Sequence, residues 1–201
     1  MHLIIISGPS GSGKSTLSSQ ILEHVENSFS LSTDNYYKTG ILSNFLSKVL
    51  EGYYDQKISF NYKLFIKDFA YILNNKTLNH EYKYDFNKKS IIKSLNKKSN
   101  ISYLIVEGIF AKELLKKSNN YHFLLIELKT TKKTCMERVL LRDVNKRGKS
   151  KKLAKRDFLV SWKIYQNNNK SNFSNQNITK LIYSESSTPE EIFKKIINLK
   201  T

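Results

Sequence analysis

Short apolar runs alternate along the chain with stretches of helical periodicity. Five apolar runs have the length of a strand: 2–7, 29–33, 102–108, 121–128 and 180–184. Five stretches carry a helical pattern: about 14–26, 61–75, 132–143, 157–165 and the segment that starts at Pro189. Strands that alternate with helices predict an α/β fold with a mainly parallel central sheet of about five strands.

Some segments carry more specific local predictions. The helix at 61–75 places five apolar residues on one face: Leu64, Phe65, Phe69, Ile72 and Leu73. In the last helix, Thr188 is placed as the N-cap, Pro189 suits the first helical position, and Glu191 completes a capping box.

Three further segments are predicted to lie outside the helices and the main sheet. The segment 81–86 alternates charged and aromatic residues, which is typical of an exposed strand or one arm of a hairpin. The segment 145–152 is charged and contains a glycine, so it predicts a mobile loop. The polar segment 167–177 predicts another loop.

The composition fits one soluble domain. Of the 201 residues, 39% are hydrophobic and 12% aromatic, which is enough to bury a sheet and its covering helices. No apolar run approaches the roughly 18 residues of a membrane span, and the run at 2–6 is too short for a signal-peptide core. Cys135 is the single cysteine and has no disulfide partner, which is typical of a reducing compartment. We therefore expect a cytoplasmic protein that has no membrane association.

The strong positive charge raises the question of nucleic-acid binding. The formal net charge is +17, but it comes from 30 lysines and only 4 arginines, in a chain that also has 20 asparagines. Arginine is the residue favoured for phosphate contacts, and the lysines are scattered along the whole length. This pattern argues against a nucleic-acid groove and favours a solvated, lysine-rich surface.

The segment GPSGSGKST follows the first predicted strand and opens the first predicted helix. Gly8, Gly13, Lys14 and Ser15 satisfy the pattern G-x-x-x-x-G-K-[ST] of a phosphate-binding loop in the required context. Glycines let backbone N–H groups point inward at phosphate oxygens, and the helix N-terminus adds its positive dipole end. The loop therefore predicts binding of ATP or GTP with Mg²⁺. The expected nucleotide-binding residues are Gly8, Ser10, Gly11, Ser12, Gly13, Lys14, Ser15 and Thr16.

Two carboxylates lie at the ends of predicted core strands. Asp34 follows the second strand and Glu107 ends the third, and ligand groups gather at the carboxyl ends of strands in an open parallel sheet. Asp34 is placed to accept a proton from a substrate hydroxyl, and Glu107 is placed to hold magnesium together with Ser15. The alternatives are a turn cap for Asp34 and an ordinary strand-end carboxylate for Glu107.

Six segments, taken in order, resemble the uridine kinase (uridine-cytidine kinase) group of P-loop kinases, which are relatives of phosphoribulokinase. The segments are IIISGPSGSGKST, LSTDNYYK, YYDQKISFN, YKYDF, LIVEGIFA and RVLLRDVNKRGKS. The resemblance implies a P-loop NTPase fold of three α/β/α layers, with a small β-hairpin substrate element and a helical lid. It also implies ATP-dependent phosphorylation of the 5′-hydroxyl of a nucleoside, a role in pyrimidine salvage, and assembly into homo-oligomers.

The same resemblance implies roles for individual residues within a single domain that spans 1–201. The acceptor-site insertion would cover about 53–90 and the lid about 145–157. Asp34, Lys14 and Arg147 would be catalytic, and Arg142 would bind the nucleotide from the lid. The expected acceptor-binding residues are Asp55, Tyr84, Phe86, Lys89 and Arg138.

The chain departs from the family pattern in the acceptor pocket. The departures are Gln56, Lys57, Lys89, Ile91 and Val139. Because these positions read the base and sugar in the family, the acceptor stays open. A phosphoribulokinase-like sugar phosphate, nicotinamide riboside and pantothenate are the alternatives. A nucleic-acid-associated NTPase is the alternative from a different class.

Overall fold

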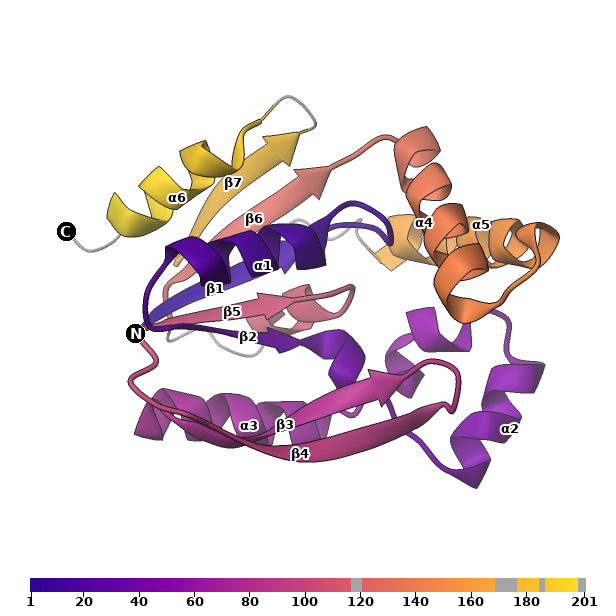
Figure 1. Cartoon of the computed structure of the whole chain (residues 1–201), viewed down its shortest axis with the longest axis horizontal. Helices are drawn as coiled ribbons and strands as arrows, with labels where there is room; N and C mark the ends of the chain where they lie inside the picture. The colour runs from indigo at the N-terminus through magenta and orange to yellow at the C-terminus, as the bar shows by residue number, and fades with distance from the viewer. Residues whose placement is uncertain (117–120, 169–176, 185–186, 199–201) are drawn as a thin grey trace.

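The computed structural model describes residues 1–116, 121–168, 177–184 and 187–198, and its centre is a parallel sheet of five strands. The strand order is β2-β5-β1-β6-β7, with every neighbouring pair parallel (Figure 1). The strands are β1 (His2–Ser7), β2 (Ser28–Ser32), β5 (Tyr103–Glu107), β6 (Phe123–Lys129) and β7 (Ile178–Ser184). The predicted α/β fold is confirmed.

The central strand β1 is apolar because both of its faces are covered. Leu3 and Ile5 point into one buried cluster, and Ile4 and Ile6 point into a second cluster on the opposite face. The second cluster includes residues of α1 (Lys14–His24) and α6 (Pro189–Ile197), which cover the same face of the sheet (Figure 1). Two covered faces give the expected three layers.

The other face of the sheet is covered by α3 (Tyr62–Asn75) and by the short helix η4 (Ala111–Lys116). Asn61 caps α3, since its side chain accepts a hydrogen bond from the Leu64 backbone N–H at 3.2 Å. The apolar face predicted for this helix is confirmed. Phe65, Phe69 and Ile72 are buried, whereas Leu64 and Leu73 pack partly buried against the same cluster.

An antiparallel hairpin lies beside α3, formed by β3 (Leu78–Asp85) and β4 (Ser90–Lys98) (Figure 1). The strand or hairpin arm predicted at 81–86 is confirmed for 81–85. Sequence reasoning missed β4 and also α2 (Ile41–Val49). Strand β4 shows no regular alternation of apolar and polar residues, whereas α2 does have apolar residues at helical spacing, a usable signal that was overlooked. Four of these residues are exposed in the structure, Ile41, Leu42, Phe45 and Val49, and Ser43 is the one buried residue of α2.

The prediction of a mobile loop at 145–152 is wrong. Helix α4 (Lys132–Arg147) runs into this segment, and α5 (Lys151–Asn168) begins within it, which leaves three residues between the helices. Gly148 ends α4 in the left-handed conformation with φ of 63°. The two helices pack on a small cluster of their own, which contains Cys135, Val139 and Phe158.

Three short 3-10 helices remain among the described residues. The remaining 3-10 helices are η1 (Thr33–Tyr36), η2 (Tyr53–Asp55) and η3 (Lys57–Ser59). Thr188 occupies the N-cap of α6 and Pro189 its first position, but the Thr188 side chain makes no capping hydrogen bond, so the predicted capping box is wrong. Most of the loop predicted at 167–177 lies outside the described residues. Along the described parts of the chain, no helix combines the length and apolarity needed to cross a bilayer.

Candidate active site

The predicted phosphate loop connects β1 to α1 at the carboxyl edge of the sheet. Eight of the residues expected to bind nucleotide lie in this loop or in the first turn of α1, and the ninth, Arg142, lies on α4. Gly11 has φ of 82°, and a Cβ atom there would lie 2.5 Å from the backbone oxygen of Cys135. Glycine is therefore required at this position by both the backbone conformation and the close approach of α4.

Lys14 is buried at the centre of the loop. Its side chain is 8% exposed, and Nζ donates to the Pro9 carbonyl oxygen at 2.9 Å. Burial lowers the pKa of the Lys14 amine, and the charges of Glu107 and Asp34 oppose this shift. The hydroxyl of Ser12 is also buried and has no hydrogen-bond partner among the described residues. A buried ammonium and an unpartnered hydroxyl at a helix N-terminus fit a phosphate group.

Glu107 ends β5 and faces the first turn of α1. Its side chain is 5% exposed, and the Ser15 hydroxyl donates to Glu107 Oε2 at 3.3 Å. Burial raises the pKa of Glu107, and the charge of Asp34 raises it further, whereas Lys14 opposes the shift. A hydroxyl and a carboxylate are the oxygen ligands that Mg²⁺ prefers, and Mg²⁺ takes few protein ligands because it keeps waters and phosphate oxygens. The pair fits a magnesium ion.

Asp34 lies in η1, directly after β2, as the sequence predicted. The Tyr37 hydroxyl donates to Asp34 Oδ1 at 3.5 Å, and Tyr37 itself is buried. Ser32, two residues before Asp34, pairs with Glu107 across β2 and β5, and the charge of Asp34 acts on the pKa values of both Lys14 and Glu107. Asp34 therefore lies beside the phosphate loop.

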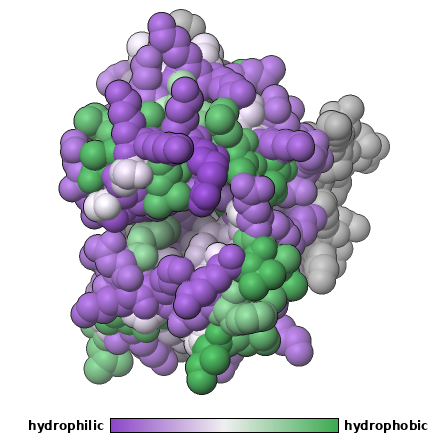
Figure 2. Space-filling view, turned by 90° about the vertical axis from the view of Figure 1, so that its right-hand side faces the viewer, coloured by the Kyte–Doolittle hydropathy of each residue, from purple (hydrophilic) through white to green (hydrophobic). Residues whose placement is uncertain are grey.

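Asp34 also lines a pocket with a volume of about 550 Å³. The pocket opens as a hollow on the side of the molecule that carries α2, α4 and α5 (Figure 2). Its size is that of a small-molecule site. Seven residues predicted from the sequence line it: Asp34, Asp55, Tyr84, Phe86, Lys89, Arg142 and Arg147.

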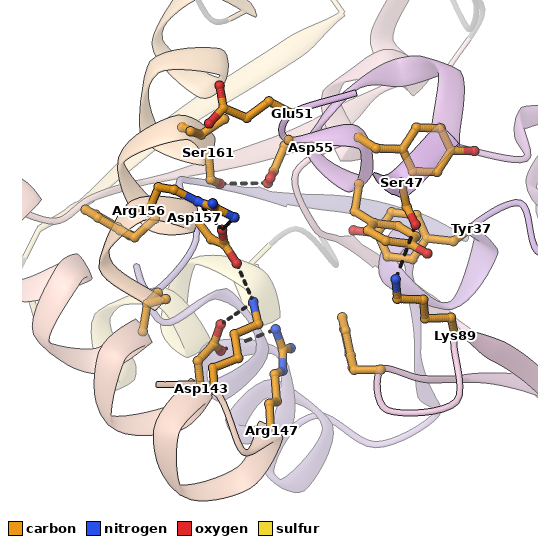
Figure 3. Close-up of a pocket in the computed structure, with 18 of the residues that line it drawn as sticks. Tyr37, Ser47, Glu51, Asp55, Lys89, Asp143, Arg147, Arg156, Asp157 and Ser161 are labelled. Atoms are coloured by element: carbon orange, nitrogen blue, oxygen red, sulfur yellow. Dashed lines mark hydrogen bonds and ion pairs between the residues drawn. The ribbon is translucent and has the colours of Figure 1, made fainter. Parts of the chain in front are cut away.

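The hairpin β3–β4 supplies one wall of this pocket. Tyr84 is buried and packs edge-on against Tyr37 with ring centroids 5.0 Å apart. Phe86 is 39% exposed, and the guanidinium carbon of Arg147 lies 3.7 Å from its ring centroid. Lys89 Nζ donates to Ser47 Oγ at 3.2 Å, which joins the hairpin to α2 (Figure 3). The wall is aromatic, with cations at its edge.

Asp55 connects the η2 segment to helix α5. The Ser161 hydroxyl donates to Asp55 Oδ1 at 2.6 Å (Figure 3). Burial raises the pKa of Asp55 to about 6, and the hydrogen bond from Ser161 opposes this shift. The carboxyl group is therefore mostly ionised at neutral pH and becomes protonated in mild acid.

We expect the raised pKa of Asp55 to appear in the pH dependence of stability. The pKa of Asp55 is about 6 in the folded protein and 3.8 in the unfolded chain. The free energy of unfolding of wild type, relative to that of Asp55→Asn, is therefore highest below about pH 4. It should fall as pH rises to about 6 and then level off. The full change is at most ~3 kcal/mol, and partial solvent exposure of the carboxyl group reduces it.

Urea unfolding at several pH values between 4 and 8 measures this difference. Asp85→Asn is the matched control. Asp85 is an aspartate on the hairpin whose pKa is lowered, so we expect no comparable change in its effect on stability between pH 4 and 8. A difference between wild type and Asp55→Asn that stays constant across this range would contradict the assignment.

One predicted acceptor-binding residue lies elsewhere. Arg138 is exposed on α4 and is not among the residues that line the pocket. Its Nη1 atom lies 3.5 Å from the Gly11 carbonyl oxygen, at the phosphate loop. Val139, the next residue, lines the pocket instead. A contact of Arg138 with the acceptor has no support in this geometry.

Sequence reasoning missed four residues that shape the pocket: Tyr37, Asp143, Lys149 and Ser161. Tyr37 and Asp143 lie next to residues that were identified, in DNYYK and LRD, so their position was a usable signal. Ser161 is 106 residues from Asp55 and lies in the segment 157–165, which was predicted only to be helical. Nothing in the local sequence marks it.

The parallel sheet, the phosphate loop and the two covering helix layers define the fold of a P-loop NTPase. The family model described as Phosphoribulokinase / Uridine kinase family matches residues 3–179. The chain belongs to this family.

Proteins similar to this chain agree with that assignment. A uridine kinase of Ureaplasma parvum serovar 3 is 29% identical over 153 residues, which are 74% of this chain and 72% of that protein. A uridine kinase of Borrelia duttonii is 32% identical over 152 residues, or 75% of this chain and 71% of that protein. D-glycerate 3-kinase from Cryptococcus neoformans shares the fold, with a TM-score of 0.56, 13% identity, and coverage of 91% of this chain and 86% of that one.

Proposed function

We propose that this protein is an ATP-dependent, magnesium-dependent kinase that phosphorylates the 5′-hydroxyl of uridine or cytidine. The observation that carries the proposal is the position of Asp34, which lies at the same end of the sheet as Glu107 and also lines the 550 Å³ pocket. A hydroxyl bound in that pocket beside Asp34 would lie next to the phosphate loop. The names of the uridine kinase relatives support a nucleoside as the acceptor.

The phosphate loop would bind the nucleotide. Lys14 would contact the outer phosphates, and the buried hydroxyl of Ser12 would gain a partner. Ser15 and Glu107 would hold magnesium, which supplies positive charge to the phosphate oxygens when it is bound. Arg142 and Arg147 would offset the charge that develops during transfer, since both line the pocket from α4.

The acceptor would bind between the hairpin and the α4–α5 pair. Asp34 would accept the proton of the attacking hydroxyl, and Tyr37 would orient the carboxylate through its hydrogen bond. Asp55 would accept hydrogen bonds from the sugar hydroxyls because an ionised carboxylate is an acceptor only. Tyr84 and Phe86 would contact the sugar or base. The α4–α5 pair would exclude water, which otherwise competes with the acceptor.

In this proposal one kinase domain spans 1–201, with the acceptor-site insertion at about 53–90 and the lid at about 145–157. The described part of the lid consists of the end of α4, a short turn and the first turns of α5. Both segments contribute residues to the pocket.

A sugar phosphate is the second candidate acceptor. Lys89 and Arg156 line the pocket in addition to Arg142 and Arg147, and they would attract an acceptor that already carries a negative charge. This candidate keeps Asp34 as the base and changes only what the far side of the pocket binds.

Purified protein with ATP and Mg²⁺ tests both candidates against a panel of nucleosides, nicotinamide riboside, pantothenate and sugar phosphates. We expect ADP release that depends on uridine or cytidine, with the nucleoside 5′-monophosphate identified by mass. Turnover with a phosphorylated sugar alone would favour the second candidate. ATP hydrolysis that no small acceptor stimulates, but that RNA or DNA does, would contradict both.

A further inference from the structure

Asp143 is a buried carboxylate on α4 that contacts three cations. It is 3% exposed, yet Oδ1 accepts from Arg142 Nε at 2.8 Å and lies 3.3 Å from Arg147 Nη1. Its second oxygen, Oδ2, lies 3.1 Å from Lys149 Nζ. One side chain therefore fixes the charged groups of three residues that line the pocket.

The backbone of Asp143 also contacts the turn that follows α4. Its carbonyl oxygen accepts the backbone N–H groups of Gly148 and Lys149, which sets the turn between α4 and α5. Lys149 continues the network to α5 through Asp157, at 3.1 Å. The position of Arg147 therefore depends on Asp143 through both the side chain and the helix end.

Electrostatics keeps Asp143 ionised. Burial acts to raise the pKa of Asp143, but the charges of Arg142 and Arg147 outweigh this effect, so the pKa lies below its ordinary value. Without that negative charge, the two guanidinium groups would repel each other in a partly buried space, since burial and then the charge of Arg142 lower the pKa of Arg147.

Arg147 is held on a second side by the hairpin. Its guanidinium carbon lies 3.7 Å from the ring centroid of Phe86, and its side chain is 20% exposed. Asp143 contacts the guanidinium edge, and Phe86 contacts its face. The arginine is therefore held between α4 and the acceptor wall of the pocket.

We propose that Asp143 is a positioning residue that fixes the guanidinium groups of Arg142 and Arg147 for phosphoryl transfer. The inference rests on the proposed function, since it assigns to Asp143 an effect that acts through the arginines. A merely structural role, in which Asp143 only ends α4, predicts a loss of stability without a specific dependence on Arg147.

A double-mutant cycle separates these roles. Arg147→Ala is expected to lower kcat by about a thousandfold, as for other arginines that stabilise a transferring phosphoryl group. Asp143→Asn is expected to lower kcat by about tenfold or more, with little change in KM for the acceptor. The double variant should lose less than the product of the two single losses, because only Arg142 is left for Asp143 to position. Losses that multiply would overturn the proposal, and so would wild-type kcat in Asp143→Asn.

Glu137→Gln is the matched control, because Glu137 is an exposed carboxylate on the same helix and lines no part of the pocket. Its kcat should equal that of wild type. Thermal unfolding of every variant shows whether it folds. If Asp143→Asn does not fold, Asp143→Glu takes its place in the cycle, since it keeps the charge and moves it by one methylene. The same non-multiplicative pattern is then expected, at about threefold or more for the single variant.

The cycle is measured twice, once with the best acceptor from the panel and once as slow ATP hydrolysis without acceptor. The second readout depends on the arginines but not on which acceptor is correct. An unexpected acceptor would therefore overturn only the proposed function. If Arg147→Ala leaves both rates at the wild-type level, the role of the arginine is wrong, and the positioning role of Asp143 is wrong with it.

Discussion

Asp34→Asn is expected to lower kcat by about a thousandfold and to leave nucleotide binding nearly unchanged. General base catalysis contributes about 10²–10⁴ to a rate, and asparagine has no carboxylate to accept the hydroxyl proton. The phosphate loop is untouched, because Lys14 and Ser12 keep their positions in the first turn of α1 and the loop before it. The measurements are the steady-state rate of transfer and calorimetric binding of ADP with Mg²⁺.

The amide that Asp34→Asn introduces would also keep a hydrogen-bond acceptor for the Tyr37 hydroxyl, so the local structure should persist. Glu23→Gln, an exposed position on α1, is the control for removal of one negative charge. Transfer at the parent rate by Asp34→Asn would show that another group accepts the proton. Loss of ADP binding would place Asp34 in the nucleotide site instead.

Gly108→Ala is expected to destabilise the protein by ~3 kcal/mol or more and to disturb the site. Gly108 directly follows Glu107, has φ of 126°, and a Cβ atom there would lie 1.9 Å from Thr33 Oγ1. Thr33 is fully buried, so it cannot move aside without shifting Asp34, which follows it. Backbone strain and overpacking each cost ~1–3 kcal/mol.

Gly148→Ala provides the comparison for this effect. Gly148 also has a positive φ, of 63°, but nothing lies within 4 Å of the Cβ position. Its expected cost is ~1–2 kcal/mol, from the left-handed conformation alone. Urea unfolding of both variants measures the difference. Equal losses would mean that the contact with Thr33 does not limit this position, and that only the backbone conformation matters.

The sequence by itself determined the features that depend on local chemistry. A run such as Leu3–Ile6 is apolar at every position because both faces of its strand are buried, and it was recognised for that reason. The phosphate loop was recognised because its glycines, lysine and hydroxyls act within a few residues of one another. The resemblance to the family followed from such short segments in their order.

Only the tertiary structure decided how the pocket is closed and which residues hold its charged groups. Ser161 contacts Asp55 across 106 residues, and Phe86 contacts Arg147 from a different element, so no local pattern relates them. The charged segment at 145–152 was predicted to be a mobile loop, yet Asp143 contacts Arg147 and Lys149 and the segment joins two helices through a three-residue turn. Charge compensation depends on distances in space, and sequence spacing alone does not set those distances.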